Sequence, residues 1–153
     1  MKVSIGKYPK KDGKQKVSVR IDPWDTWNMD ATLALIIHPM LKQLKKTTHG
    51  APYVDDEDVP EHLRTSAAKP KKNDWDVDSN HFKRWDWVLS EMIWAFGEEV
   101  KNKEPYFWIE KPKWNKDGIV KDGKLDKEKR DKYLGRKKNA FCLFGKYYEN
   151  LWD

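Results

Sequence analysis

The chain has 153 residues, a net charge of +6 and a single cysteine, which excludes an intramolecular disulfide. Its length predicts one domain, residues 1–153. Charged residues make up 37% of the chain, but nine Trp, six Tyr and five Phe predict a folded core rather than disorder. The apolar runs are shorter than the roughly 18 residues that a membrane span needs. No signal-like segment follows Met1, so we expect a cytoplasmic protein with no membrane partner.

Residues 1–22 are predicted to form a β-hairpin, because apolar and polar side chains alternate on both sides of an Asp12-Gly13 turn signal. Residues 29–47 are predicted to form a helix, since their apolar residues recur at spacings of three and four. Pro39 lies inside this helix and lacks an amide hydrogen, so we expect a kink there.

Residues 51–78 are predicted to be mostly loop, with one short helical turn near Pro60. Residues 79–103 are predicted to form the central helix, capped by Asp78; its apolar side chains on nearly all sides predict burial. Extra short strands are predicted near residues 105–120, and Asp126 is expected to cap a last helix over roughly residues 127–151. The predicted fold class is therefore α+β, with an N-terminal β-hairpin packed beside three main α-helices, the central one buried.

Charge is unevenly distributed along the chain. Residues 1–22 carry a net charge of +5 and residues 110–138 of +6, whereas residues 23–109 carry −4. Basic segments of this kind attract nucleic acids or phosphorylated small molecules, although a lysine-rich solvated surface is the simpler explanation.

Several polar residues have more than one reading. Residues 55–58 (DDED) allow three interpretations: acids that precede a short helix, a magnesium site, or a contact for a basic partner. His38 is either a core histidine or a catalyst, and Cys142 is predicted to be packed and inert. The sequence contains no Gly-rich phosphate loop, nucleophile elbow or His-Glu-x-x-His motif. We therefore predict no catalytic residues, no metal and no cofactor.

Aromatic side chains beside cations are the candidates for ligand binding. Trp24 and Trp27 follow the predicted hairpin and lie close to Arg20 in the sequence. Aromatic rings can stack a base, and a guanidinium can hold a phosphate. Arg84 and Trp87 are the next candidates, because cation and ring lie within one turn of the central helix. The alternative is that these tryptophans only fill the core.

Four segments carry a family resemblance. They are residues 23–33 (PWDTWNMDATL), 53–60 (YVDDEDVP), 84–96 (RWDWVLSEMIWAF) and 143–148 (LFGKYY). Together they resemble segments of small proteins of large tailed bacteriophages, a family with no assigned activity. The resemblance implies expression in the cytoplasm of an infected bacterial host and supplies no catalytic residues.

The favoured hypothesis is a non-catalytic phage protein that binds, and sequesters, a nucleotide-like small molecule such as a signal of bacterial antiviral defence. It rests on the aromatic and basic composition, the missing catalytic motifs and the phage-like segments. The alternative is a nucleic-acid-binding or protein-binding accessory factor of phage infection, based on the basic ends. A hydrolase that uses the acidic loop is a third hypothesis. The aromatic-rich helices are expected to leave apolar surface uncovered, which predicts a homo-oligomer, most simply a homodimer.

Overall fold

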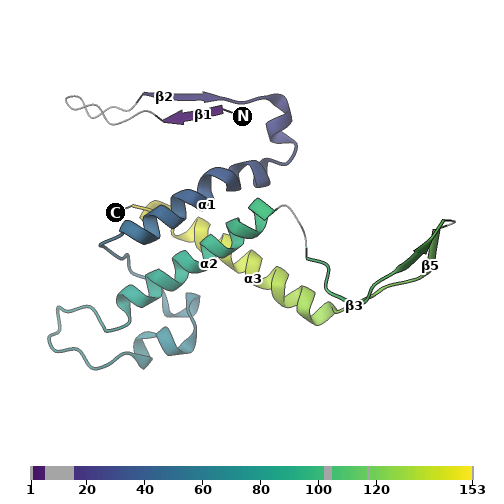
Figure 1. The fold of residues 1–153 in the computed structure, drawn as a ribbon. Helices are drawn as coiled ribbons and strands as arrows, with labels where there is room; N and C mark the ends of the chain where they lie inside the picture. The colour runs from purple at the N-terminus through teal and green to yellow at the C-terminus, as the bar shows by residue number, and fades with distance from the viewer. Residues whose placement is uncertain (1, 6–15, 102–104, 117, 153) are drawn as a thin grey trace.

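The computed structural model describes residues 2–5, 16–101, 105–116 and 118–152. These residues form three α-helices, α1 (Met29–Thr47), α2 (His81–Lys101) and α3 (Lys127–Lys146), which lie together in one body (Figure 1). Two antiparallel ribbons project from this body, one before α1 and one between α2 and α3. The predicted α+β class, with an N-terminal strand pair and three helices, is confirmed.

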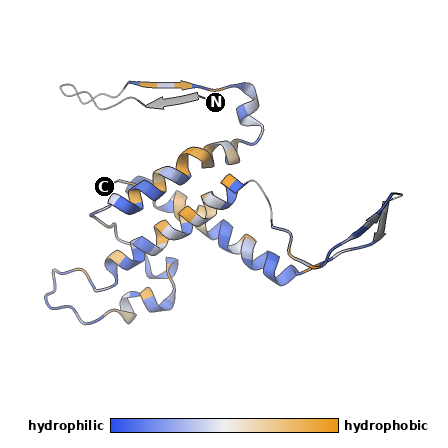
Figure 2. Ribbon diagram, in the orientation of Figure 1, coloured by the Kyte–Doolittle hydropathy of each residue, from blue (hydrophilic) through white to orange (hydrophobic). Residues whose placement is uncertain are grey.

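The N-terminal ribbon consists of β1 (Lys2–Ile5) and β2 (Val17–Arg20), paired antiparallel from Lys2↔Arg20 to Ile5↔Val17. The turn predicted around residues 9–13 lies outside the described residues. We expected this hairpin to pack beside the helices, but β2 is exposed along its whole length. Figure 2 shows hydrophobic residues along β2 and α1. The reason is that α2, and not the hairpin, covers the buried side of α1.

α1 is preceded by a 3-10 turn, η1 (Pro23–Thr26), which Asp22 and Asp25 close in a reciprocal capping box. The helix continues through Pro39 and buries only Ala34 and Leu41 among its side chains. Most of the apolar stripe predicted for this helix is therefore partly or fully exposed.

The prediction that the central helix is buried is confirmed for one broad side of α2, which contributes more buried residues than any other described element. Its core side chains pack against α1, α3 and the loop before α2 and include Trp85, Val88, Leu89, Met92 and Phe96. Burial is not complete around the helix, since Phe82 is exposed. α2 begins at His81, two residues later than predicted, and Asp78 accepts from the Asn80 amide at 2.9 Å.

The segment between α1 and α2 contains three short 3-10 turns, η2 (Asp56–Asp58), η3 (Glu61–Leu63) and η4 (Thr65–Ala67), where the sequence predicted one turn. Val54, Val59 and Leu63 of this segment are buried in the core. The segment is therefore part of the folded body, although it has little regular secondary structure.

The second ribbon confirms the strands predicted near residues 105–120. β3 (Trp108–Glu110) pairs with β6 (Lys124–Leu125), and β4 (Lys113–Asn115) pairs with β5 (Gly118–Lys121). Gly118 has φ +129°, a conformation that favours glycine at the β4–β5 turn. Asp126 caps α3 as predicted, accepting from the Lys129 amide at 3.0 Å, and a last turn, η5 (Tyr148–Asn150), follows. Among the described helices, none is long and apolar enough to cross a membrane.

Candidate functional site

The residues predicted at the hairpin junction are all on the surface. The capping box fixes η1 through bonds of 2.8 Å from the Asp22 amide to Asp25 and 3.1 Å from the Trp24 amide to Asp22. The Trp24 and Trp27 rings lie 6.1 Å apart at 32° and are 77% and 79% exposed. Arg20 is exposed as well. These tryptophans therefore do not fill the core.

Arg84, the fourth predicted residue, lies inside the protein and is only 1% exposed. Its guanidinium donates to both carboxylate oxygens of Asp78, at 3.0 and 2.5 Å, and to the Leu63 carbonyl at 3.2 Å. This bonding lowers the pKa of Asp78 and raises the pKa of Arg84. The Arg84 guanidinium, which was predicted to hold a phosphate, therefore binds a carboxylate of the same chain. These bonds connect α2 to the loop that precedes it.

Trp87, the fifth predicted residue, is half-buried on α2. It lines a hollow of about 430 Å³ whose other walls are Leu63, Phe82, Lys83, Asp86 and Ser90. The cation of this hollow is Lys83, and Arg84, the neighbour predicted to act with Trp87, is not among the lining residues.

The acidic run at residues 55–58 meets a basic residue of the same chain. Lys146 Nζ lies 2.7 Å from Asp55 Oδ2 and 2.6 Å from Asp58 Oδ2. The buried Tyr147 hydroxyl donates to Asp58 Oδ2 at 2.6 Å and accepts from the Asp55 amide at 3.1 Å. Burial and the bond to Asp58 raise the pKa of Tyr147 to about 12, and the carboxylates raise the pKa of Lys146. Within the part of the chain that the structure describes, no group of three or more His, Cys, Asp or Glu is placed to hold a metal ion.

A groove between α1 and α2 brings together residues that the sequence analysis did not connect. One part, about 490 Å³, is lined by Lys42, Lys45, Lys46, Ser90, Ile93 and Trp94. An adjoining part, about 340 Å³, shares Lys42 and Lys46 and adds His38, Pro39 and Gln43. The volumes fall within the range of about 300–1,000 Å³ that is common for ligand sites.

The three lysines of the groove are not equivalent. Lys45 Nζ is held by Asp86 at 3.1 Å and by Ser90 Oγ at 2.5 Å. In contrast, neither Lys42 nor Lys46 forms an ion pair with any described residue. Burial, together with the charge of Lys42, lowers the pKa of His38. The groove therefore carries two uncompensated ammonium groups beside a mainly neutral imidazole.

Trp94 is the aromatic wall of this groove and is held in place from α3. Arg136 Cζ lies 3.9 Å from the Trp94 ring centroid, and the Arg136 guanidinium donates twice to Glu91, at 2.8 Å each. The Tyr133 ring packs edge-on to Trp94 at 5.5 Å. Such contacts fix the indole before any ligand arrives.

The groove left one signal in the sequence. His38, Lys42 and Lys46 are spaced by four residues, so they fall on one face of the first helix. The contribution of Trp94 could not be read from the sequence, because it depends on how α1 and α2 pack.

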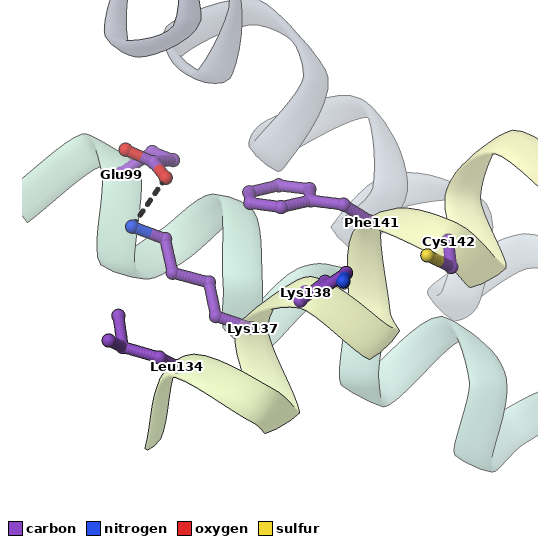
Figure 3. A pocket seen from close by; sticks show the side chains of 6 residues that line it. All are labelled: Glu99, Leu134, Lys137, Lys138, Phe141 and Cys142. Carbon is purple, nitrogen blue, oxygen red and sulfur yellow. Dashed lines mark ion pairs between the residues drawn. The ribbon is translucent and has the colours of Figure 1, made fainter. Parts of the chain in front are cut away.

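Another hollow of about 490 Å³ lies beside α3 and is lined by Glu99, Leu134, Lys137, Lys138, Phe141 and Cys142 (Figure 3). Lys137 is paired with Glu99 across it at 2.6 Å. Cys142 is exposed, which corrects the prediction that it is packed; it lies on the outer side of α3, whereas Leu143 enters the core. Because its carboxylate and one of its ammonium groups neutralise each other, this hollow is a weaker candidate than the groove.

Comparisons of this chain with protein-family models, with curated proteins and with solved structures find no match.

Proposed function

We propose that the protein is a non-catalytic binding protein for a small phosphorylated ligand that carries an aromatic base, such as a nucleotide, and that this ligand lies in the groove between α1 and α2. The supporting observation is that Lys42 and Lys46 line the same groove as Trp94 while no described carboxylate pairs with either lysine. Ammonium groups form charge-assisted bonds to phosphate, and the indole offers an apolar wall for a base.

The groove is a better location than the hairpin junction for physical reasons. Trp24 and Trp27 are 77% and 79% exposed, whereas Trp94 is half-buried and lines the same hollow as three lysines. Arg84 is unavailable because Asp78 holds it. Arg20 with the exposed tryptophan pair is the competing location, and the experiment must separate the two.

Calorimetry with a panel of mono-, di- and cyclic nucleotides tests the proposal. Binding of at least one should weaken about tenfold for each of Lys42→Gln and Lys46→Gln, since each loses a charge-assisted bond. Lys83→Gln, in the hollow beside Trp87, is the matched control and should bind as the unaltered protein does. Loss of binding in Arg20→Ala or Trp27→Ala, with the groove variants unaffected, would move the site to the hairpin junction.

The finer form of the proposal is sequestration of a nucleotide signal of antiviral defence inside an infected bacterium. It is supported by the phage-like segments and by the missing catalytic motifs. A sequestering protein returns its ligand unchanged, so chromatography of the nucleotide released by heating should recover the input molecule. Recovery of a cleaved nucleotide would instead identify an enzyme.

A second candidate function, nucleic-acid binding, is favoured by the ribbon between α2 and α3. Its strands carry the exposed side chains Lys113, Trp114 and Lys121, and two-stranded ribbons fit nucleic-acid grooves. DNA or RNA binding that weakens steeply with salt, and that Lys113→Gln reduces, would support this function. Absence of nucleotide binding together with such a salt slope would replace the first proposal.

A further inference from the structure

A prominent feature of the molecule is a set of exposed apolar side chains at its N-terminal side, here called the N-terminal apolar surface. Its members belong to β2, η1 and α1 and are between 41% and 79% exposed: Val17, Val19, Trp24, Trp27, Leu33 and Met40. Figure 2 shows the hydrophobic character of β2 and α1 on this side of the molecule. Exposed apolar surface of this extent marks an interface in a folded protein.

The solvent-exposed area of the chain is larger than that of a typical monomer of the same mass. The chain exposes 12,240 Å², whereas a monomeric protein of 18.2 kDa exposes about 8,100 Å². The excess, about 4,000 Å², exceeds the roughly 800 Å² per partner that a standard stable interface buries, and also the larger areas of obligate dimers. This excess is a property of the whole chain, and the N-terminal apolar surface is the part of it where exposed large apolar side chains follow one another along β2, η1 and α1.

The charges beside this surface are complementary to each other. Lys16 and Arg20 are exposed at and beside β2, and Asp30 is exposed in the first turn of α1. A two-fold axis between these two parts of the surface places Lys16 and Arg20 of one copy against Asp30 of the other. A second copy of the chain is complementary to these charges by symmetry, whereas an unrelated apolar partner is not required to carry complementary charges.

We infer that a second copy of this chain covers the N-terminal apolar surface and forms a two-fold symmetric dimer. Trp24 and Trp27 are the anchors, because they are the most exposed side chains of this surface and the capping box fixes the backbone turn that carries them. Lys16 and Arg20 of each copy face Asp30 of the other copy, which is exposed in the first turn of α1. The residues that line the groove between α1 and α2 are not members of the N-terminal apolar surface, so the inference does not depend on a ligand in that groove.

Sedimentation equilibrium of the full chain tests the dimer. The unaltered protein should approach twice 18.2 kDa as its concentration rises, and Trp27→Lys with Leu33→Lys should remain at 18.2 kDa with unchanged circular dichroism. The matched control is Tyr53→Lys with Trp75→Lys, at two aromatic side chains that are 75% and 83% exposed elsewhere; it should remain dimeric. An 18.2 kDa species at every concentration, a dimer that survives Trp27→Lys with Leu33→Lys, or a dimer broken equally by the control would overturn the inference.

A charge-reversal series tests the orientation of the two copies. Lys16→Glu with Arg20→Glu should weaken the dimer, and so should Asp30→Lys, each by about tenfold at low salt. An equimolar mixture of these two variants should form a mixed dimer tighter than either variant alone forms, because opposite charges face each other again at one end. No preference for the mixed dimer would show that the two copies do not pair head to tail along this surface.

Discussion

Arg84 and Asp78 show how one buried residue pair determines the start of α2. Both side chains are nearly inaccessible, and the two terminal nitrogens of the guanidinium donate to the Asp78 carboxylate and to the Leu63 carbonyl. Replacing Asp78 with Asn leaves a buried cation without its counter-charge, which costs about 3–5 kcal/mol of unfolding free energy. Urea unfolding measures this loss. Asp86→Asn is the matched control, because the Lys45–Asp86 pair is exposed and contributes about 0–1 kcal/mol. Equal losses in the two variants would contradict the structural role of Arg84.

Because of Tyr147, we expect the folding stability of the protein to decrease at high pH. The pKa of Tyr147 is raised from 10.0 to about 12, so the protonated phenol is favoured in the folded state. The stabilisation is complete below pH 10 and is lost as the pH rises from about 10 towards 12. The Tyr147→Phe variant should be less stable at neutral pH by about 1–3 kcal/mol, since Asp58 and the Asp55 amide lose a partner. Its unfolding midpoint should fall less steeply than that of the unaltered protein between pH 10 and 12, which thermal melts at several pH values would show.

His38 carries the opposite pH dependence. Its pKa is lowered below 6.5, chiefly by burial, so the folded state favours the neutral imidazole. The associated stability is complete above pH 6.5 and decreases as the pH falls below that value. His38→Gln should remove this part of the acid sensitivity. If a phosphorylated ligand occupies the groove, it should favour the protonated imidazole, and calorimetry in buffers of different ionisation heat should then detect proton uptake below pH 6.5.

At the scale of elements, α1 and α2 approach each other closely because α2 has a glycine where His38 meets it. A methyl group on Gly97 would lie 3.2 Å from His38 Nε2, whereas one on Gly135 of α3 would meet nothing within 4 Å. Gly97→Ala should therefore be less stable than Gly135→Ala, because the His38 ring must move by a few tenths of an ångström, and it should disturb the groove. Gly135→Ala should stabilise it by up to about 1 kcal/mol, since alanine favours helix. Denaturant melts of both variants check the pair, and a Gly97→Ala variant as stable as Gly135→Ala would show that the two helices are not closely packed there.

At the scale of the whole molecule, stability should be greatest at the centre and smallest in the ribbons. α2 contacts both other helices, and replacing its buried Phe96 with Ala should cost about 3–5 kcal/mol. The ribbon between α2 and α3 pairs only with itself in two-stranded units. Native-state hydrogen exchange should consequently be slowest for amides in α2 and fastest for amides in β4 and β5. Comparable rates in these elements would contradict the assignment of α2 as the centre of the fold.

The sequence by itself determined the elements, because periodicity, turn signals and caps are local. The N-terminal strand pair, the three helices, the Asp126 cap and the ribbon after residue 105 were all predicted from neighbouring residues. Tertiary structure alone decided which side chains are buried, since burial depends on which faces meet. Trp24 and Trp27 are exposed and Arg84 is buried, although local sequence made them similar candidates for a ligand site. The groove with Lys42, Lys46 and Trp94 likewise exists only because α1 packs against α2 at Gly97, and residues about 50 positions apart share no local signal of such packing.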